Sequence, residues 1–284
     1  MLTVLDIIKR TTDFLKGKEV ENARLNAEHL VGHALGLPRM QLYLQFERPL
    51  EEEDLEKIRP LVRRRGQREP LQYIMGTTEF FGVELKVDRR ALIPRPETEH
   101  LAAQIVEKLP QSPKTILDLG TGSGALALSL AQHYSDAKVL ATDVSADAVA
   151  LTKENAAALN LTDRVEVRES DWFAAIEGDA TYNLIVSNPP YLSEQETQET
   201  LTEVKDYEPR IALTPGGSES GLESYEIIIR DAHKHLAPGG LLAMETGIAQ
   251  REALEELLTR SEYARHEFVA DLTERERFVF AWKD

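Results

Sequence analysis

Apolar residues near the start of the chain recur at the spacing of a helix. Leu5, Ile8 and Leu15 follow Thr3, a typical N-cap residue. The segment ENARLNAEHLVGHALG (21–36) repeats the pattern, and residues 51–65 begin with acids and end with bases, as helices do. We therefore predict an N-terminal helical domain over residues 1–72.

The pattern then changes from helical to strand-like. Residues 78–88, TEFFGVELKVD, form two short β-type runs around Gly82, which predicts a hairpin. A proline-punctuated segment, IPRPETE (93–99), follows it. We expect residues 73–95 to form a β-hairpin linker between the helical domain and a second domain over residues 96–284.

Strand-like and helix-like stretches alternate through the second domain. The apolar runs are TILDL (115–119), KVLAT (138–142), RVEVR (164–168), NLIVS (183–187) and LLAME (241–245). Such alternation predicts an α/β fold with a doubly wound, Rossmann-like parallel sheet. Two late runs, HEFVAD and RFVFAW, are expected to form an antiparallel pair near the C-terminus.

Composition narrows the possible chemistry. The 284 residues contain no cysteine, which excludes disulfides, thiolate zinc sites, iron–sulfur clusters and a cysteine nucleophile. No apolar run reaches the roughly 18 residues needed to cross a bilayer, and MLTVLDIIKR lacks a basic leader. We expect a soluble, cytoplasmic protein. The net charge of −16 argues against a broad nucleic-acid surface.

One basic segment departs from the acidic balance. Five arginines occur within ten residues: Arg59, Arg63, Arg64, Arg65 and Arg68. They fit a helix C-terminus whose cations complement the dipole, with Gly66 ending the helix. A docking patch for RNA or a partner is the alternative.

Candidate ligand-binding residues follow the first three strands, because ligands bind at the carboxyl ends of such sheets. A glycine loop that leads into a helix favours close approach of a ligand. Asp143 can accept both hydroxyls of a ribose, Trp172 can stack on adenine, and Asp171 can accept the adenine amine. These features indicate an adenosine ligand, which NAD and S-adenosylmethionine both contain. The glycine loop comprises Asp118, Gly120, Thr121, Gly122, Ser123 and Gly124.

The fourth strand runs into Asn188-Pro189-Pro190-Tyr191. The prolines remove two amide donors, so the Asn188 side-chain oxygen and the Pro189 carbonyl can both accept from one NH2 group. Tyr191 offers a flat face to a planar amide or base. A dehydrogenase has no need of this arrangement, whereas a methyltransferase that acts on a planar nitrogen does.

Several motifs together resemble one family. The glycine loop and NPPY resemble class I S-adenosylmethionine-dependent amino-methyltransferases. EPLQYIMG (69–76), EFFG (79–82), IPRPETE (93–99), YEPRIAL (207–213) and GLESY (221–225) are similar to the release-factor glutamine methyltransferases of the PrmC/HemK type. The similarity covers nearly the whole chain. It departs in the tail, where DLTERER (271–277) has charged residues in place of the family's glycine between an Asp and an Arg.

The resemblance implies a helical bundle, a hairpin and a seven-stranded methyltransferase domain. It implies S-adenosylmethionine as cofactor without a metal, and class I peptide-chain release factors as partners, methylated on the glutamine of their Gly-Gly-Gln loop. The glycine loop, Asp143, Trp172 and Asn188 would contact the cofactor, and residues 188–191 the glutamine. Arg95 and Glu97 could line the substrate mouth, or Glu97 could stabilise the following helix. A monomer without direct nucleic-acid or membrane binding is expected.

Three other functions are compatible with parts of the pattern. An adenine N6 or cytosine N4 nucleic-acid methyltransferase would use NPPY for a flipped base. A non-catalytic adenosine-binding or ribosome-associated module would leave NPPY without a use, as would an NAD oxidoreductase. The polar connection 192–222 is long enough to suggest substrate recognition.

Overall fold

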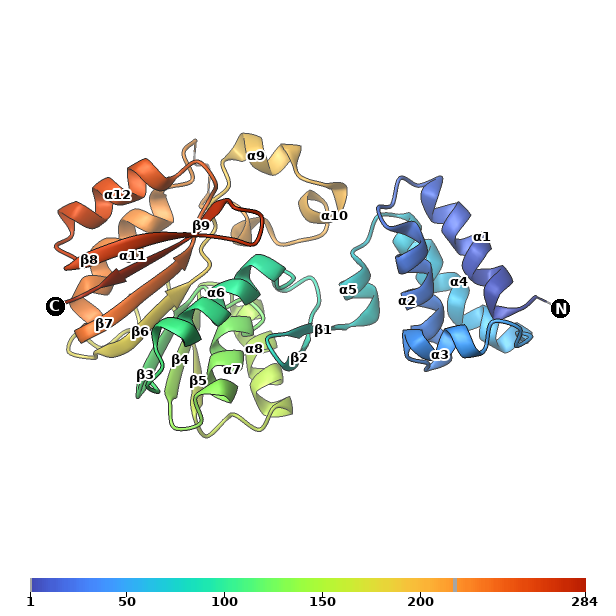
Figure 1. Ribbon diagram of the computed structural model, residues 1–284, viewed down its shortest axis with the longest axis horizontal. Helices are drawn as coiled ribbons and strands as arrows, with labels where there is room; N and C mark the ends of the chain where they lie inside the picture. Colours follow the sequence, from blue (N-terminus) through green and yellow to red (C-terminus); the bar gives the residue numbers. More distant parts are fainter. Residues whose placement is uncertain (1, 217–218) are drawn as a thin grey trace. The chain divides into compact units, whose positions relative to one another are not determined.

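The computed structural model describes residues 2–216 and 219–284 (Figure 1). The chain forms two compact units, one of Met1–Thr77 with Leu201–Tyr207, the other of Thr78–Thr200 with Glu208–Asp284. The sequence-based boundaries at 72 and 95 differ from this division in two ways. Residues 78–95 of the hairpin segment belong to the second unit and residues 73–77 to the first, and residues 201–207 of the connection after NPPY also belong to the first.

The first unit is helical. Thr3 and Asp6 form a capping box, in which the Asp6 amide donates to Thr3 Oγ1 at 3.2 Å and Asp6 Oδ2 accepts from the Thr3 amide at 3.0 Å. Ile8 and Leu15 are buried as their spacing predicts, whereas Leu5 is only partly buried. Its helices are α1 (Val4–Lys16), α2 (Ala23–Leu35), α3 (Arg39–Leu44), α4 (Glu52–Gly66), α5 (Leu71–Met75) and α10 (Thr202–Lys205).

The arginine cluster ends α4 and is largely neutralised inside its own unit. Arg65 is buried and donates to Asn26 Oδ1 at 2.8 Å and to Glu203 Oε1 at 2.9 Å. Arg68 donates to both carboxylate oxygens of Glu203, at 2.7 and 2.6 Å. Arg64 pairs with Glu69. These contacts favour the helix-end interpretation over an open cationic patch.

The expected hairpin opens the second unit. Strands β1 (Thr77–Phe80) and β2 (Val83–Lys86) flank Gly82, and their apolar side chains Phe80, Val83 and Leu85 are buried against the larger sheet's helices. The alternation of buried and exposed residues in β2 is the period-2 pattern that the sequence displays. The hairpin is therefore part of the second unit's core.

The central sheet has seven strands, as expected, in the order β5-β4-β3-β6-β7-β9-β8. The first five are parallel, and β9 lies antiparallel between β7 and β8. The order reverses at β3, next to β4 and β6, which opens a crevice at their carboxyl ends. The strands are β3 (Thr115–Leu119), β4 (Lys138–Asp143), β5 (Val165–Glu169), β6 (Tyr182–Ser187), β7 (Leu236–Glu245), β8 (Arg265–Ala270) and β9 (Glu276–Trp282).

Helices cover both faces of this sheet (Figure 1). Ile116 and Leu184 point to one face and pack with helices α6 (Pro96–Lys108), α7 (Ala125–His133) and α8 (Ala146–Ala158). Leu117 and Ile185, one residue further along, pack on the other face with α11 (Glu223–His235) and α12 (Arg251–Arg260). Both faces are therefore buried, which explains the continuous apolar runs in the sequence.

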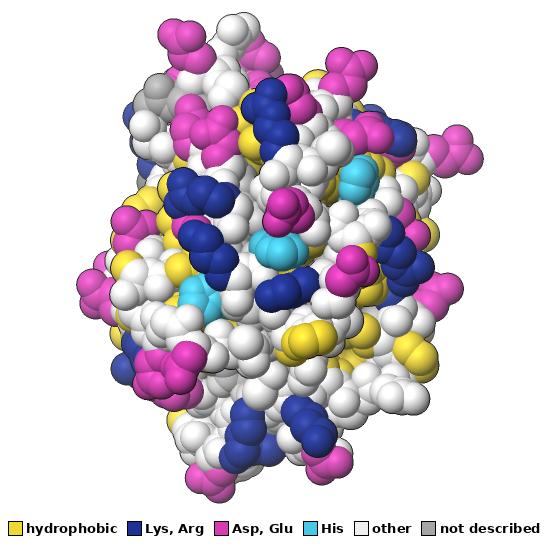
Figure 2. All heavy atoms as spheres, turned by 90° about the vertical axis from the view of Figure 1, so that its left-hand side faces the viewer, with side chains coloured by type: hydrophobic (Ala, Val, Ile, Leu, Met, Phe, Trp, Pro, Cys, Tyr) yellow, Lys and Arg dark blue, Asp and Glu magenta, His cyan; other side chains and the backbone are white. Residues whose placement is uncertain are grey.

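The open edge of the sheet at β8 is polar. Arg265 stacks over Trp282, with its guanidinium carbon 3.9 Å from the ring centroid, and Lys108 pairs with Glu267. Seen from the side of α12 and β8, charges of both signs are interspersed and apolar groups are scattered (Figure 2). Charged edge strands resist pairing with other chains. Within residues 2–216 and 219–284, no helix has both the length and the apolar character to cross a membrane.

Candidate functional site

A cavity of about 560 Å³ lies in the second unit at the carboxyl ends of β3, β4 and β6. Gly124, Pro189, Tyr191 and Glu97 are absent from its lining. The sequence-predicted residues that line it are Arg95, Asp118, Gly120, Thr121, Gly122, Ser123, Asp143, Asp171, Trp172, Asn188 and Pro190.

Gly124 does not line the cavity but packs against the side chains of α7 and α8. It has a φ of +87° and precedes α7. A Cβ at this position would lie 2.8 Å from Leu128 Cδ1 and 2.9 Å from Thr152 Cγ2. Both the left-handed backbone and the close approach of α8 therefore require glycine here.

Asp118 is a buried carboxylate with one free oxygen. Its Oδ2 accepts from Thr121 Oγ1 at 2.6 Å and from the Ala127 amide at 3.1 Å. Its Oδ1 is buried and has no hydrogen-bond partner within the protein. Burial raises the pKa of Asp118 to about 7. A cationic ligand group next to this oxygen would compensate the cost of burying the charge.

Asp143 ends β4 with its carboxylate at the cavity. Its Oδ2 accepts from the Gly122 amide and its Oδ1 from the Ser145 amide, each at 2.9 Å. Each oxygen retains a lone pair, which fits the two hydroxyls of a ribose. Desolvation by burial raises the pKa of Asp143, while the backbone donors oppose that shift.

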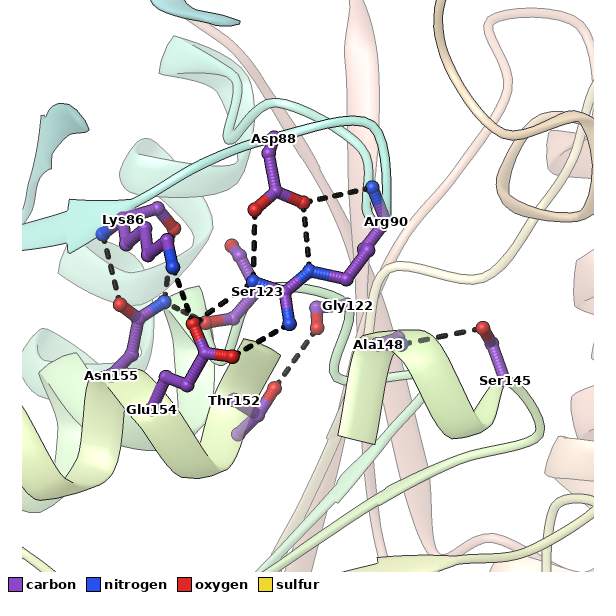
Figure 3. A network of polar contacts seen from close by, with 10 residues as sticks. All are labelled: Lys86, Asp88, Arg90, Gly122, Ser123, Ser145, Ala148, Thr152, Glu154 and Asn155. Atoms are coloured by element: carbon purple, nitrogen blue, oxygen red, sulfur yellow. Dashed lines mark hydrogen bonds and ion pairs between the residues drawn. The ribbon is translucent and has the colours of Figure 1, made fainter. Parts of the chain in front are cut away.

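Side chains of helix α8 link the glycine loop to Lys86, the last residue of strand β2 (Figure 3). Thr152 Oγ1 donates to the Gly122 carbonyl at 2.9 Å. The Asn155 side chain contacts both Lys86 and Ser123. Around them, Arg90 pairs with Glu154. The loop conformation is thus determined by side chains of another element, which pre-organises it for a ligand.

Trp172 occupies a strained backbone conformation, with a φ of 46°. Ser170 Oγ donates to the Trp172 carbonyl at 2.8 Å and accepts from the Ala175 amide at 2.9 Å, which stabilises the turn. The indole lies beside the glycine loop, since a Cβ on Gly120 would be 3.9 Å from Trp172 Cζ3. Asp171 lines the cavity next to it. This arrangement can receive an adenine ring.

Asn188 presents its side-chain oxygen without a protein partner. Its Nδ2 donates to Thr98 Oγ1 at 2.9 Å, whereas its Oδ1 is buried and unpaired. Pro189 is buried behind it and Pro190 lines the cavity. A buried acceptor of this kind is costly until a donor reaches it, and a ligand NH2 group would supply one.

Tyr191 is directed at a buried ion pair. Its hydroxyl donates to Glu245 Oε1 at 3.1 Å and accepts from Arg277 Nη2 at 2.7 Å. The Arg277 guanidinium carbon lies 5.1 Å from the centroid of the Tyr191 ring. Burial, followed by the charge of Glu245, raises the pKa of Tyr191. Tyr191 is absent from the cavity lining, and contact of its ring with a substrate amide stays a prediction.

The cavity mouth contains a second ion pair. Arg95, which precedes α6, donates to Glu208 Oε2 at 2.6 Å, and the Glu208 side chain is almost fully buried. Glu97 and Glu99 lie in the first turn of α6, and Glu99 accepts from the Phe81 amide at 2.9 Å. The connection after NPPY contributes to this mouth, because residues 209–212 and 214–216 also line the cavity.

Several site residues were not predicted from the sequence. Thr214 and Ser224 line the cavity with buried, unpartnered hydroxyls. Glu245 is the last residue of β7, so reading the carboxyl end of the fifth strand would have found it. No local sequence pattern points to Arg277 as a site residue, because only the pairing of β9 with β7 brings it to the site.

Two family models match the chain. The PrmC N-terminal domain matches residues 6–76, and the methyltransferase small domain matches residues 99–220. Such residues as Asp118, Asp143 and Asn188 fall within the second match. Among the described residues, no group of three or more His, Cys, Asp or Glu side chains could bind a metal ion.

Curated relatives resemble the chain over most of its length. A release factor glutamine methyltransferase of Rhodopirellula baltica is 41% identical, over 86% of this chain and 83% of its own. That of Geobacter sulfurreducens is 41% identical over 91% and 89%. The solved T. thermophilus 16S rRNA N2 G1207 methyltransferase, in complex with AdoMet and guanosine, shares the fold, with a TM-score of 0.54, 20% identity, and coverage of 73% and 50%. The chain belongs to the release factor glutamine methyltransferase family.

Proposed function

We propose that this protein transfers a methyl group from S-adenosylmethionine to the side-chain amide nitrogen (N5) of the glutamine in the Gly-Gly-Gln loop of class I release factors. The observation that carries the proposal is the buried, unpaired Asn188 Oδ1 at the cavity wall. It is followed by two prolines that offer carbonyls but no amide donors. Family membership supplies the substrate class.

The cavity residues fit the cofactor. Asp143 retains acceptor capacity for the ribose diol, and Trp172 with Asp171 can receive the adenine. The free Asp118 Oδ1 suits a cationic group of the amino-acid portion. When bound, S-adenosylmethionine supplies an electrophilic methyl group on a sulfonium.

The protein's own contribution is to orient a weak nucleophile. An amide nitrogen is poorly nucleophilic because its lone pair is delocalised into the carbonyl. Asn188 Oδ1 accepts a hydrogen bond from the substrate NH2, which fixes its direction and favours pyramidalisation. The Pro189 carbonyl, expected as a second acceptor, belongs to a buried residue outside the cavity lining. The nitrogen loses a proton during or after transfer. Positioning and electrostatic matching account for catalysis in this scheme.

The test uses methyl-labelled S-adenosylmethionine with a class I release factor and, separately, with duplex and single-stranded DNA and RNA. Mass spectrometry locates the label. A single methyl group on the Gly-Gly-Gln glutamine is expected, with kcat lowered roughly 10²-fold or more in Asn188→Ala and cofactor affinity changed less. Near-normal turnover of this variant would contradict the role of Asn188.

Label in nucleic acid but not in protein would replace the proposal by a nucleic-acid methyltransferase. The net charge of −16 and the ion-paired arginines in and just after α4 argue against that outcome. The proposal includes the cytoplasm as compartment, because release factors act there. It also includes a monomeric enzyme, which the charged β8 edge favours.

A further inference from the structure

A continuous chain of hydrogen bonds leads from Asn188 through Thr98, which also lines the cavity, to Glu245 and Arg277. Asn188 Nδ2 donates to Thr98 Oγ1 at 2.9 Å, and Thr98 Oγ1 donates to Glu245 Oε2 at 2.6 Å. The other carboxylate oxygen of Glu245 accepts from Arg277 Nη2 at 3.0 Å and from the Tyr191 hydroxyl at 3.1 Å. Thr98 and Glu245 are buried.

With Glu245 ionised, the donors and acceptors in this chain permit one direction only. Arg277 can only donate, so it stabilises Glu245 as an acceptor-only carboxylate. The single hydroxyl hydrogen of Thr98 must then go to Glu245. Thr98 can therefore only accept from Asn188, and the Asn188 NH2 must face Thr98.

The reverse orientation of the Asn188 amide would place two acceptors against each other. It would also aim the Asn188 NH2 at a substrate NH2, donor against donor. We propose that Thr98, Glu245 and Arg277 are positioning residues that make Asn188 present its carbonyl oxygen, and not its NH2, to the substrate amide. This inference rests on the proposed function for its substrate, but the orientation itself does not depend on any substrate.

The scheme makes an isosteric substitution of Glu245 disruptive. In Glu245→Gln, Arg277 still requires an acceptor, so the new amide oxygen faces Arg277 and the new NH2 faces Thr98. Thr98 then accepts from residue 245 and donates to Asn188. That reverses the chain and turns the Asn188 NH2 toward the cavity, although no atom has been removed from the site.

The kinetic test compares Thr98→Val, which removes the hydroxyl, with Thr98→Ser, which retains it, together with Glu245→Gln. Tyr263→Phe is the matched control, because it removes another buried hydroxyl of the same unit, bonded to the Ile229 carbonyl at 2.9 Å. We expect kcat to fall roughly 10²-fold in Thr98→Val and Glu245→Gln, with KM and cofactor Kd within about threefold of wild type. Thr98→Ser and Tyr263→Phe should stay within about threefold in kcat.

Near-normal kcat in Thr98→Val, or an equal loss in Thr98→Ser, would overturn the proposal. If Glu245→Gln does not fold, the difference in kcat between Thr98→Val and Thr98→Ser tests the proposal on its own. The same variants are measured without substrate through the ¹⁵N–¹H signal of the Asn188 side chain, assigned by its loss in Asn188→Asp. This signal should shift in Thr98→Val and Glu245→Gln but not in Thr98→Ser or Tyr263→Phe.

The two readouts separate this inference from the proposed function. If the wild-type enzyme methylates no release factor but the Asn188 signal shifts as expected, the orientation stands and the substrate assignment fails. If release factor is methylated and the signal does not shift in Thr98→Val, the positioning role is wrong while the proposed function stands.

Discussion

The side-chain amide of Asn155 donates a hydrogen bond of 2.8 Å to the Ser123 carbonyl and another of 3.0 Å to the Lys86 carbonyl. Its Oδ1 accepts from the Lys86 amide at 2.9 Å. One buried residue of α8 therefore joins the glycine loop to strand β2 (Figure 3). The hairpin at the start of the second unit and the loop that faces the cavity share this anchor.

Replacing Asn155 by Leu should destabilise the protein by about 3 kcal/mol or more, since it leaves three backbone groups without their partner. The measurement is urea unfolding. Glu154→Gln, next to it on α8, is the control, because Glu154 forms exposed ion pairs with Lys86 and Arg90 and should shift the midpoint little. Equal losses in the two variants would contradict an anchoring role for Asn155.

Trp172→Ala should weaken cofactor binding by about 1–3 kcal/mol, the value of an aromatic stacking platform. Isothermal titration with S-adenosylmethionine measures it directly. Trp282, stacked under Arg265 at the far edge of the sheet, offers a matched control. If Trp172→Ala binds the cofactor as tightly as Trp282→Ala, the indole does not contact the adenine.

Asp118→Asn should stabilise the ligand-free protein at neutral and alkaline pH. Burial raises the pKa of Asp118 to about 7 from an ordinary value of 3.8, so the unfolded chain loses this proton first as pH rises. The folded protein therefore loses up to about 4 kcal/mol of its free energy of unfolding as pH rises from the ordinary pKa to the raised one. Asparagine does not titrate and still accepts from Thr121 and Ala127.

Thermal melting at two pH values tests this expectation. Asp118→Asn should melt above wild type at about pH 8 and near it at about pH 4, where Asp118 is protonated in both states. A difference that is the same at both pH values would mean that the charge of Asp118 is not the cause. Cofactor binding should be weaker in the variant, because a neutral side chain no longer attracts a cationic group.

Local patterns predicted the elements better than they predicted the contacts of the site. The seven strands follow from apolar runs of strand length, and the cavity residues of β3, β4 and β6 follow from their place after strands. Tyr191 shows the limit. Its position in NPPY predicts a face toward substrate, which stays a prediction, and gives no sign that its hydroxyl is bonded to Glu245 and Arg277, which tertiary pairing alone brings there.

Glu203→Ala should destabilise the first unit by about 2–3 kcal/mol, because it leaves the buried Arg65 and the half-buried Arg68 without their shared carboxylate. The ion pairs lower the pKa of Glu203, so its contribution is present above the ordinary value of 4.5 and is lost as pH falls further. Thermal melting measures it. Glu52→Ala removes the exposed partner of Arg59 and should change the melting temperature far less.

Glu274→Gly should raise the free energy of unfolding by up to about 1 kcal/mol. Glu274 lies in the charged tail segment 271–277 with a φ of 63°, a left-handed conformation that costs a residue with a Cβ about 1 kcal/mol. Asp271 Oδ1 closes this turn by accepting from the amides of Thr273 at 2.7 Å and Arg275 at 3.1 Å. Glycine adopts the same turn without strain.

Glu274→Ala separates backbone strain from charge. It removes the same negative charge from a chain of net charge −16 but retains the Cβ. If strain is the cause, only the glycine variant gains stability in urea unfolding. If alanine gains as much, relief of charge repulsion is the cause. Because the turn leads directly into β9, a more stable turn should also leave Arg277 in place, so kcat should not change.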